Sequence, residues 1–359
     1  MPQSLVSLLT PCYNTGKYIH RLLDSVLNQS YSSIEMVVID DGSTDNSRDI
    51  ILSYVDRFSQ KGYSLKYLYQ NNSGQSVAIQ NGLQYVNGKY LAWPDSDDFY
   101  AANDAIEKMV SALENTSDEF AMVLTQEQLL DENDLHFVGV LGLHVRKYEE
   151  KSLFEDCLFD KNGYYFPPGA YMVNFQKLLN STELPIFTAK NAGQNWQLML
   201  PVLWNYRCIS ISEILYSVLI RKSSHSRGQY KGYCATAAKI DAYKQTILGT
   251  LDRIRGMDQN ICDAYKVSIN NKYYTEFMWL AIQYNQKNDF YKYYKKARKK
   301  LFCKNNSHTF KNRFIVYYVY KVFYIMKKCR LYIICAVKKI RRFRNVFFPL
   351  NAKKTNFFF

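Results

Sequence analysis

The sequence predicts an α/β domain with a mostly parallel central sheet flanked by helices. Predicted strands and helices alternate four times within about the first hundred residues, which is typical of βαβ units with right-handed crossovers. Runs such as 5–10 are apolar almost throughout, as strands buried on both faces of a sheet are. A polar loop follows each of these strands. Because ligands bind beyond the carboxyl ends of strands in such sheets, we expect these loops to meet at one edge.

The individual elements follow from composition and spacing. Short runs rich in leucine and β-branched residues predict strands at 5–10, 34–39, 65–69 and 89–92. Apolar residues at helical spacing predict helices at 19–27, 50–58, 77–85 and 106–113. Further strands are expected at 120–125, 171–173, 207–211 and 215–220, a helix after Gly193, and helices beyond about 233. Residues 126–165 give no clear assignment. We therefore expect a domain over 1–230, with halves 1–115 and 116–230, and a helical C-terminal region over 231–359.

Charge is distributed unevenly along the chain. The net charge is +14, but no Asp or Glu follows Asp289, so residues 290–359 carry +20 and residues 1–289 carry −6. An acidic body argues against a catalytic domain that binds nucleic acid, and a basic tail favours a polyanionic surface. No G-x-G-x-x-G follows the first strand and no P-loop occurs, so the sequence offers no motif for a dinucleotide cofactor or for P-loop hydrolysis.

The cysteines and the N-terminus indicate the compartment. The eight cysteines are far apart, without a C-x-x-C pair, as in a reduced cytosolic protein. The apolar run 5–9 is too short for the core of a signal peptide and has no basic leader. We expect the active domain to be cytoplasmic.

The acidic stretch 93–98 is the strongest candidate for chemistry. Asp95, Asp97 and Asp98 follow the fourth predicted strand, where three carboxylates would repel one another unless a cation lay among them. Mg²⁺ or Mn²⁺ prefers such oxygen ligands and leaves positions for water and substrate phosphates. The alternative is a solvated acidic turn, since Asp and Ser favour turns.

Four motifs together resemble family 2 of the inverting glycosyltransferases, enzymes of the GT-A fold that use nucleotide-sugar donors. They occupy 6–14, 37–45, 72–76 with 81–83, and 95–98, in the family's order and spacing. The resemblance implies that 1–115 binds the nucleotide and 116–230 the acceptor, with a divalent metal, Mn²⁺ or Mg²⁺, as cofactor. It covers the first hundred residues well and the region 120–230 more loosely.

The resemblance also implies roles for single residues. It assigns the nucleotide-sugar site to Pro11, Tyr13, Asn14, Asp41, Gly74, Asp95 and Ser96. Asp41 would accept a hydrogen bond from the base and Tyr13 would stack on it. Asp97 would be the direct metal ligand. His225 would be a second metal ligand, or else a surface histidine in a serine-rich loop.

One position departs from the family. The general base is usually an Asp at the start of a late helix, where this chain has Asn195, which cannot take a proton. Three explanations are open. The base is another carboxylate, with Asp98, Asp160 and Glu213 as candidates; the site relies on a dissociative transition state; or the protein binds a sugar nucleotide without turnover. A second departure is Ile79-Gln80, where relatives often carry Arg-Asn.

The basic tail predicts a membrane surface as a partner. Its apolar runs 314–326 and 331–337 are shorter than the roughly 18 residues that span a bilayer. One helix over 313–344 would have a broad basic face and an apolar strip, which suits an anionic leaflet. The alternatives are docking on the catalytic domain and non-specific binding to RNA. We expect transfer from a UDP-sugar to a glycan or lipid-linked acceptor at the inner face of the cell membrane, and no specific nucleic-acid partner.

Overall fold

The computed structural model describes residues 3–142, 153–161, 168–191, 193–221, 231–301 and 321. Contacts divide the chain into two compact units, Met1–Tyr273 and Tyr274–Phe359. The first unit contains the whole sheet, and its core includes residues of the helix that follows Gly232, such as Ile247. The division of the chain at 115 and at 230 concerns which part binds the nucleotide and which the acceptor, and it stays a prediction.

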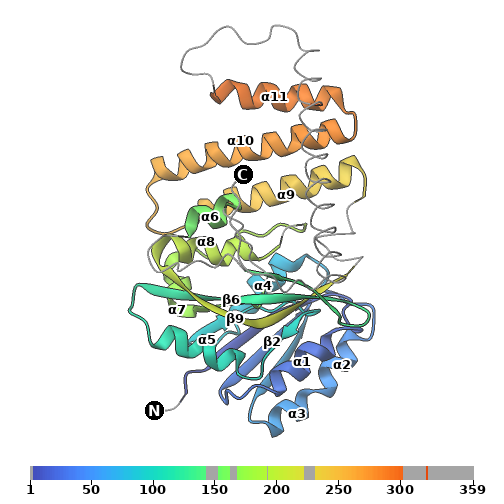
Figure 1. The fold of residues 1–359 in the computed structure, drawn as a ribbon, viewed down its shortest axis with the longest axis vertical. Coiled ribbons are helices and arrows are strands. Elements are labelled where there is room, and N and C mark those ends of the chain that lie inside the picture. The colour runs from blue at the N-terminus through green and yellow to red at the C-terminus, as the bar shows by residue number, and fades with distance from the viewer. Residues whose placement is uncertain are drawn as a thin grey trace, which may run out of the picture. The chain divides into compact units, whose positions relative to one another are not determined.

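A nine-stranded mixed sheet forms the centre of the first unit (Figure 1). Its order is β3-β2-β1-β4-β8-β6-β9-β5, and β7 pairs with β6. The strands are β1 Val6–Cys12, β2 Ile34–Asp40, β3 Ser64–Tyr69, β4 Tyr90–Ala92, β5 Phe99–Tyr100, β6 Phe120–Asp131, β7 Phe137–Leu141, β8 Tyr171–Asn174 and β9 Arg207–Ile220. The strands β1 to β4 are parallel, as predicted. The second half is mixed, because β8 runs antiparallel to both β4 and β6 while β9 runs parallel to β6.

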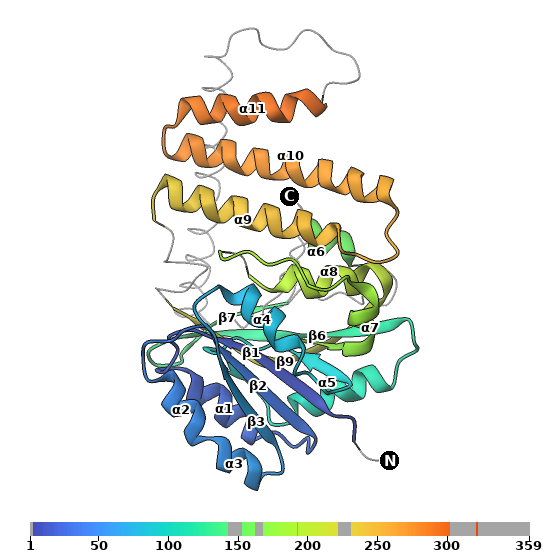
Figure 2. The ribbon, with the colours of Figure 1, turned by 180° about the vertical axis from the view of Figure 1, so that it is seen from behind.

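Helices cover both faces of the sheet (Figure 2). One face packs against α1 Ile19–Leu27, α2 Ser47–Ser53, α3 Val55–Gln60 and α5 Ala105–Glu114. The other packs against α4 Gln75–Leu83, α7 Phe175–Ser181 and α8 Asn195–Asn205, and α6 Phe154–Phe159 and α9 Tyr233–Leu251 pack on α8. Two separate apolar cores result, which is the layering expected of a sheet buried on both faces. The helix α10 Gln259–Gln283 begins in the first unit, and α11 Lys287–Leu301 belongs to the second.

Two predicted elements differ from the structure. The strands expected at 207–211 and 215–220 are one strand, β9, because it stays paired with β6 across register shifts that absorb the polar residues between them. The helix expected at 50–58 is two, α2 and α3, which meet at Tyr54. The strand predicted to end at Pro11 continues to Cys12.

The register of the parallel strands brings their following loops together. Cys12 pairs with Asp40, and Asp40 pairs with Tyr69, so β1, β2 and β3 end side by side. The strand β4 lies on the other side of β1. The loops after all four strands therefore share one edge, as the sequence predicts.

Among the described residues, no helix combines the length and the apolar character needed to cross a bilayer. The tail segments 314–326 and 331–337, on which the membrane prediction depends, lie outside the described part of the chain except for Lys321.

The buried Glu35 on β2 gives a test of the fold. Its carboxylate accepts hydrogen bonds from Ser7 Oγ and from Asn87, at 2.7 Å from the backbone N and 3.0 Å from Nδ2. Glu35→Ala would leave the buried Ser7 hydroxyl and two N–H groups of Asn87 without this acceptor, so we expect the free energy of unfolding to fall by about 2–3 kcal/mol in urea titrations. The matched control is Glu114→Ala, which removes a half-exposed surface ion pair with Lys89 and should cost under about 1 kcal/mol. Equal losses in the two variants would contradict this account.

Candidate active site

The acidic turn between β4 and β5 is the centre of the site. Trp93, which is fully buried, anchors its start, and a hydrogen bond of 3.2 Å from Asp98 N to Asp95 O closes it. One carboxylate oxygen from each of Asp95, Asp97 and Asp98 lies within 4.8 Å of the others. The sequence-predicted metal residues are therefore gathered in one place rather than spread along a solvated turn.

Burial makes this concentration of negative charge costly. Burial and, next, the charge of Asp97 raise the pKa of Asp95 to about 7. The amide groups of Gln75 and Gln194 each donate to Asp95 Oδ1, at 2.8 and 3.0 Å, and partly offset this effect. Burial followed by the charges of Asp97 and Asp95 raises the pKa of Asp98 well above its usual range. The backbone N of Leu219 donates to Asp98 Oδ1 at 2.8 Å.

A guanidinium group supplies positive charge to the turn. Arg221, which directly follows β9, places Nε 2.6 Å from Asp97 Oδ2, and both side chains are only 17% exposed. Its guanidinium also lies 4.9 Å from the centre of the Tyr18 ring. Tyr18 Oη in turn donates to Glu132 at 2.7 Å. Arg221 thus supplies, beside Asp97, part of the positive charge that a metal ion would supply.

The donor set of the turn fits a divalent cation. Three carboxylates within 4.8 Å offer hard oxygen ligands, and the raised pKa values of Asp95 and Asp98 show that the site favours a positive partner. Asp95 and Asp97 are the residues that would hold Mg²⁺ or Mn²⁺, and Asp98 lies beside them. His225, the other predicted ligand, lies outside the described residues.

The loop after β2 forms a second anionic centre on the same edge. Asp41 is buried, and its carboxylate accepts from Ser73 N at 2.8 Å, from Gly74 N at 2.9 Å and from Gln70 Nε2 at 2.7 Å. These neutral donors occupy most of the lone pairs of the Asp41 carboxylate without a cation. Asp41 is therefore fixed in place between the loops that follow β2 and β3.

The residues predicted around the base differ in their accessibility. Tyr13 is 49% exposed, so its ring is open for stacking. Pro11 lies within β1 and pairs with Ile39. Asn14 holds two loops together, because its N donates to Ser43 Oγ at 2.9 Å and its Oδ1 accepts from Thr44 N at 2.8 Å. The side-chain oxygen of Asn14 thus already has a structural partner.

The predicted Gly74 and Ser96 connect the loops of the site. Gly74 has a φ of +99°, and a Cβ there would lie 2.6 Å from the carbonyl oxygen of Lys190, so only glycine fits. Ser76 Oγ binds the same segment, 3.0 Å from both the N and the O of Ala189. Ser96 is buried and accepts from Thr15 Oγ1 at 3.1 Å, which joins the acidic turn to the loop after β1.

The position of the family base is occupied by a fixed amide. Asn195 begins α8, and its Oδ1 accepts from Tyr171 Oη at 2.6 Å and from Trp93 Nε1 at 3.3 Å. Next to it, Gln194 is 1% exposed, and its Oε1 is buried without a hydrogen-bond partner in the structure. Gln194 Nε2 binds Asp95, so the two amides connect α8 with the acidic turn.

The other candidate bases occupy different positions. Glu213 pairs with Lys108 at 2.5 Å and lies six residues before Leu219 on β9, or about 20 Å along the strand from the turn. Asp160 follows α6 and pairs with Lys272 at 2.5 Å. Asp98 is the candidate base that the structure places in the acidic turn. The sequence analysis overlooked Glu127, which is 1% exposed and contributes to raising the pKa of Asp98.

The departure at Ile79-Gln80 also has a structural explanation. Ile79 is fully buried, and Gln80 Oε1 accepts from Ile186 N at 2.7 Å. Gln80 therefore supports the segment that precedes α8.

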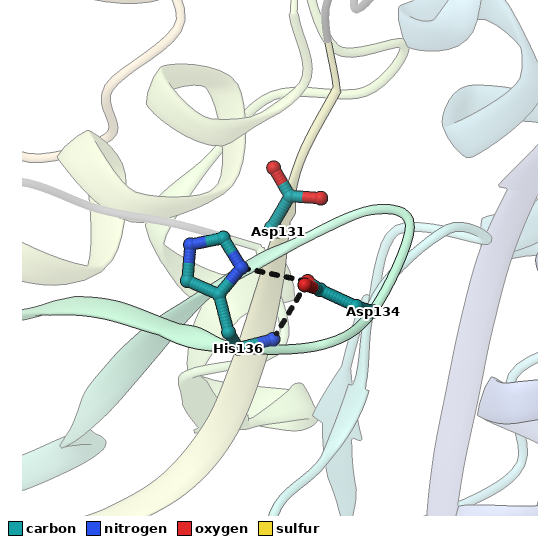
Figure 3. Close-up of side chains that lie close together, drawn as sticks. All are labelled: Asp131, Asp134 and His136. Carbon is teal, nitrogen blue, oxygen red and sulfur yellow. Dashed lines mark hydrogen bonds and ion pairs between the residues drawn. The ribbon is translucent and has the colours of Figure 1, made fainter.

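A second group of potential ligands lies on the turn between β6 and β7 (Figure 3). His136 Nδ1 lies 2.6 Å from Asp134 Oδ1, and Asp131 Oδ1 accepts from Asn133 N at 2.9 Å. Asp134 and His136 are exposed, and the hydrogen bonds of the turn account for their positions. The hydrogen bond that the His136 ring donates to the Asp134 carboxylate raises the pKa of His136.

Gln70 and Arg221 are among the site contacts that the sequence alone did not indicate. Gln70 contacts Asp41 and Arg221 contacts Asp97. Both directly follow a strand, as Tyr13 and Asp41 do. That shared position is the signal by which they could have been found.

Proton competition gives a pH prediction for the metal site. Below about pH 7 Asp95 is protonated in the metal-free protein, and a metal ion must displace that proton. We expect the dissociation constant for Mn²⁺ to rise about tenfold when the pH falls from 8 to 6. Calorimetric titration in buffers of different ionisation enthalpy measures both the affinity and the released proton. An affinity that does not depend on pH would contradict the raised pKa.

Arg221 gives a second prediction. Because its guanidinium lies beside Asp97, Arg221→Gln should tighten Mn²⁺ binding without nucleotide by roughly three- to tenfold. The matched control is Arg207→Gln, since Arg207 begins β9 and pairs with Glu119 at 3.2 Å. Titration of free Mn²⁺ by its paramagnetic resonance signal measures both. Weaker binding in Arg221→Gln would show instead that Arg221 organises the metal ligands.

Comparisons with known proteins agree with this geometry. Residues 7–161 match the model of glycosyl transferase family 2. An uncharacterized glycosyltransferase of Rickettsia prowazekii is 35% identical over 128 residues, which are 36% of this chain and 38% of the relative. Glycosyltransferase GlyA of Streptococcus pneumoniae is 29% identical over 227 residues, which are 62% of this chain and 31% of the relative. The matches thus span less than half of these relatives' length.

A solved structure supports the fold. S. aureus TarS 1–349 in complex with UDP-GlcNAc has a TM-score of 0.59 at 17% sequence identity, covering 80% of this chain and 79% of that chain. The fold is therefore of the GT-A type, as the motifs imply. Residues 7–161 are thus similar to glycosyl transferase family 2.

Proposed function

We propose that the protein is a metal-dependent glycosyltransferase that moves a sugar, with inversion, from a nucleotide-sugar, in particular a UDP-sugar, to a glycan or lipid-linked acceptor. The observation that carries this proposal is the position of two anionic centres on one sheet edge. One is Asp41, fixed by neutral donors, and the other is the acidic turn 95–98. A nucleoside needs a hydrogen-bond acceptor, and a diphosphate needs a bridging cation.

Different residues would bind the base and the diphosphate of the donor. Tyr13 offers an exposed ring for stacking on the base, and Asp41 accepts a hydrogen bond from it. Asp95 and Asp97 would hold the metal against the diphosphate, and Gln75 and Gln194 keep Asp95 in place. When bound, the metal would supply Lewis-acid stabilisation of the charge on the leaving diphosphate.

The comparison with TarS supports the choice of donor. That protein binds UDP-GlcNAc and shares the fold over most of both chains. For the proton of the acceptor, Asp98 is the base candidate that the turn itself contains. Transfer through a dissociative transition state would require less proton removal from the acceptor by this carboxylate.

The basic tail supports a place at the membrane. Residues 290–359 carry +20, a charge that favours an anionic leaflet, where each Lys or Arg contributes about 1 kcal/mol. The proposal includes a peripheral position on the inner face of the cell membrane and a pathway of polysaccharide or lipopolysaccharide synthesis. A lipid-linked acceptor would explain why a cytoplasmic enzyme binds there.

One observation favours a second candidate, a sugar-nucleotide binding module without turnover. Asn195 occupies the position of the family base, and two donors fix its oxygen. Such a module would bind UDP with metal but would not release UDP from a donor, even with the acceptor present.

The test is release of UDP from a panel of nucleotide-sugars, with Mn²⁺ or with a chelator. We expect one donor to be turned over in a metal-dependent way and Asp97→Ala to lose at least about a hundredfold in rate, because the metal loses a direct ligand. The matched control is Asp134→Ala, which removes a carboxylate from the exposed second group and should leave the rate unchanged.

The outcomes separate the two candidates. Metal-dependent binding of UDP without turnover, in the presence of membranes that contain acceptor lipids, would favour the binding module. Turnover that survives the chelator and Asp97→Ala would overturn the metal-dependent mechanism.

A further inference from the structure

Three side chains form a hydrogen-bonded series that ends at the proposed base-binding carboxylate. Asn81 Nδ2 donates to Gln70 Oε1 at 2.8 Å, and Gln70 Nε2 donates to Asp41 Oδ1 at 2.7 Å. Asn81 lies on α4 and Gln70 directly follows β3. The amide of Gln70 therefore bridges an exposed helix position and a buried carboxylate.

Chemistry fixes the orientation of both amides. An ionised carboxylate only accepts hydrogen bonds, so Gln70 must turn its NH₂ group toward Asp41. Its carbonyl oxygen then faces Asn81, which must present its own NH₂ group. The orientation of each amide is set by its neighbour, and Asp41 determines the direction of the whole series.

This arrangement fills one oxygen of Asp41 and leaves capacity on the other. Each carboxylate oxygen has two lone pairs. Gln70 Nε2 and Ser73 N, at 2.7 and 2.8 Å, occupy both lone pairs of Oδ1. Oδ2 accepts from Gly74 N at 2.9 Å. Among the described residues these three are the donors to the carboxylate, so Asp41 can accept one further N–H strongly, at Oδ2, and not two at once.

Bases differ in the number of donors that they offer to a carboxylate. Uracil has one ring N–H, at N3, between two carbonyl groups. Guanine has two adjacent donors, N1–H and the N2 amino group, which suit a carboxylate with both oxygens open. Beside a carboxylate with one open lone pair, guanine would leave a donor without a partner.

We propose that Gln70, oriented by Asn81, limits Asp41 to a single acceptor and so selects uracil over guanine in the donor nucleotide. This inference rests on the proposed function, because it requires that Asp41 contacts the base. Gln70 is a positioning residue that acts through Asp41. Its contribution lies in blocking Oδ1 as well as in holding the carboxylate.

The experiment compares binding of UDP and GDP in the presence of Mn²⁺, by calorimetric titration of the full chain. In the unmodified protein UDP should bind more tightly. Gln70→Met removes the donor at similar size and opens one lone pair of Oδ1. We expect the ratio of the GDP to the UDP dissociation constant to fall at least about fivefold, the effect of one hydrogen bond. A purely structural role would weaken both nucleotides equally and leave the ratio unchanged.

A second variant tests the orientation of Gln70 without altering Gln70 itself. Asn81→Asp removes the NH₂ donor and attracts the NH₂ group of Gln70 away from Asp41. The ratio should fall in the same direction but less, because position 81 is exposed to water. The double variant should match Gln70→Met alone, since Asn81 acts only through Gln70. The control is Gln84→Met. Gln84 is an exposed glutamine at the C-terminal end of α4, and its Nε2 donates to a backbone carbonyl.

The outcomes distinguish the inference from the proposed function. If the unmodified protein binds UDP with metal but Gln70→Met keeps the same ratio, the selection by Gln70 is wrong and the proposed function stands. If the unmodified protein binds neither nucleotide, the proposed function fails and this inference with it. A shifted ratio in Gln70→Met and Asn81→Asp, but not in Gln84→Met, confirms it.

Discussion

The confinement of three carboxylates at the end of a buried strand is the constraint on which the site depends. Asp95, Asp97 and Asp98 cannot all be charged there without a positive partner, and burial raises the pKa values of Asp95 and Asp98 accordingly. Donors from segments that are distant in the sequence contact these carboxylates. Leu219 N and Arg221 come from the end of β9, and Gln194 comes from the start of α8. The second half of the sheet thus supplies a hydrogen-bond donor and a positive charge to the carboxylates that the first half positions.

The two anionic centres of the edge are balanced differently, and this difference suits different parts of a nucleotide-sugar. Asp41 receives backbone and amide N–H groups, so it stays in one orientation and needs no cation. The acidic turn has fewer neutral donors than it has lone pairs and takes a guanidinium in addition. A carboxylate fixed by neutral donors and left with one open lone pair can accept an N–H of a base, whereas a cluster short of positive charge can hold a metal and, through it, phosphates.

Asn195 shows how a site can keep its architecture and change its proton chemistry. Its oxygen accepts from Tyr171 and Trp93, so the amide is built into the wall of the site rather than left over from a lost base. Trp93 belongs to the acidic turn, and Tyr171 lies against it with ring centres 4.5 Å apart. The start of α8 is therefore coupled to the acidic turn through side chains that do not titrate near neutral pH.

The sequence by itself determined the parallel strands β1 to β4, the helices between them and the four loops at their ends, because apolar periodicity and turn residues are local signals. It therefore predicted Asp41, Gly74 and the acidic turn as one site. Only the tertiary structure decided how β8, β6 and β9 pair, and which distant groups complete the site. Leu219 is 121 residues from Asp98, and Arg221 farther still from Asp97. Such contacts carry no local signal, since they depend on strand pairing that the whole core decides.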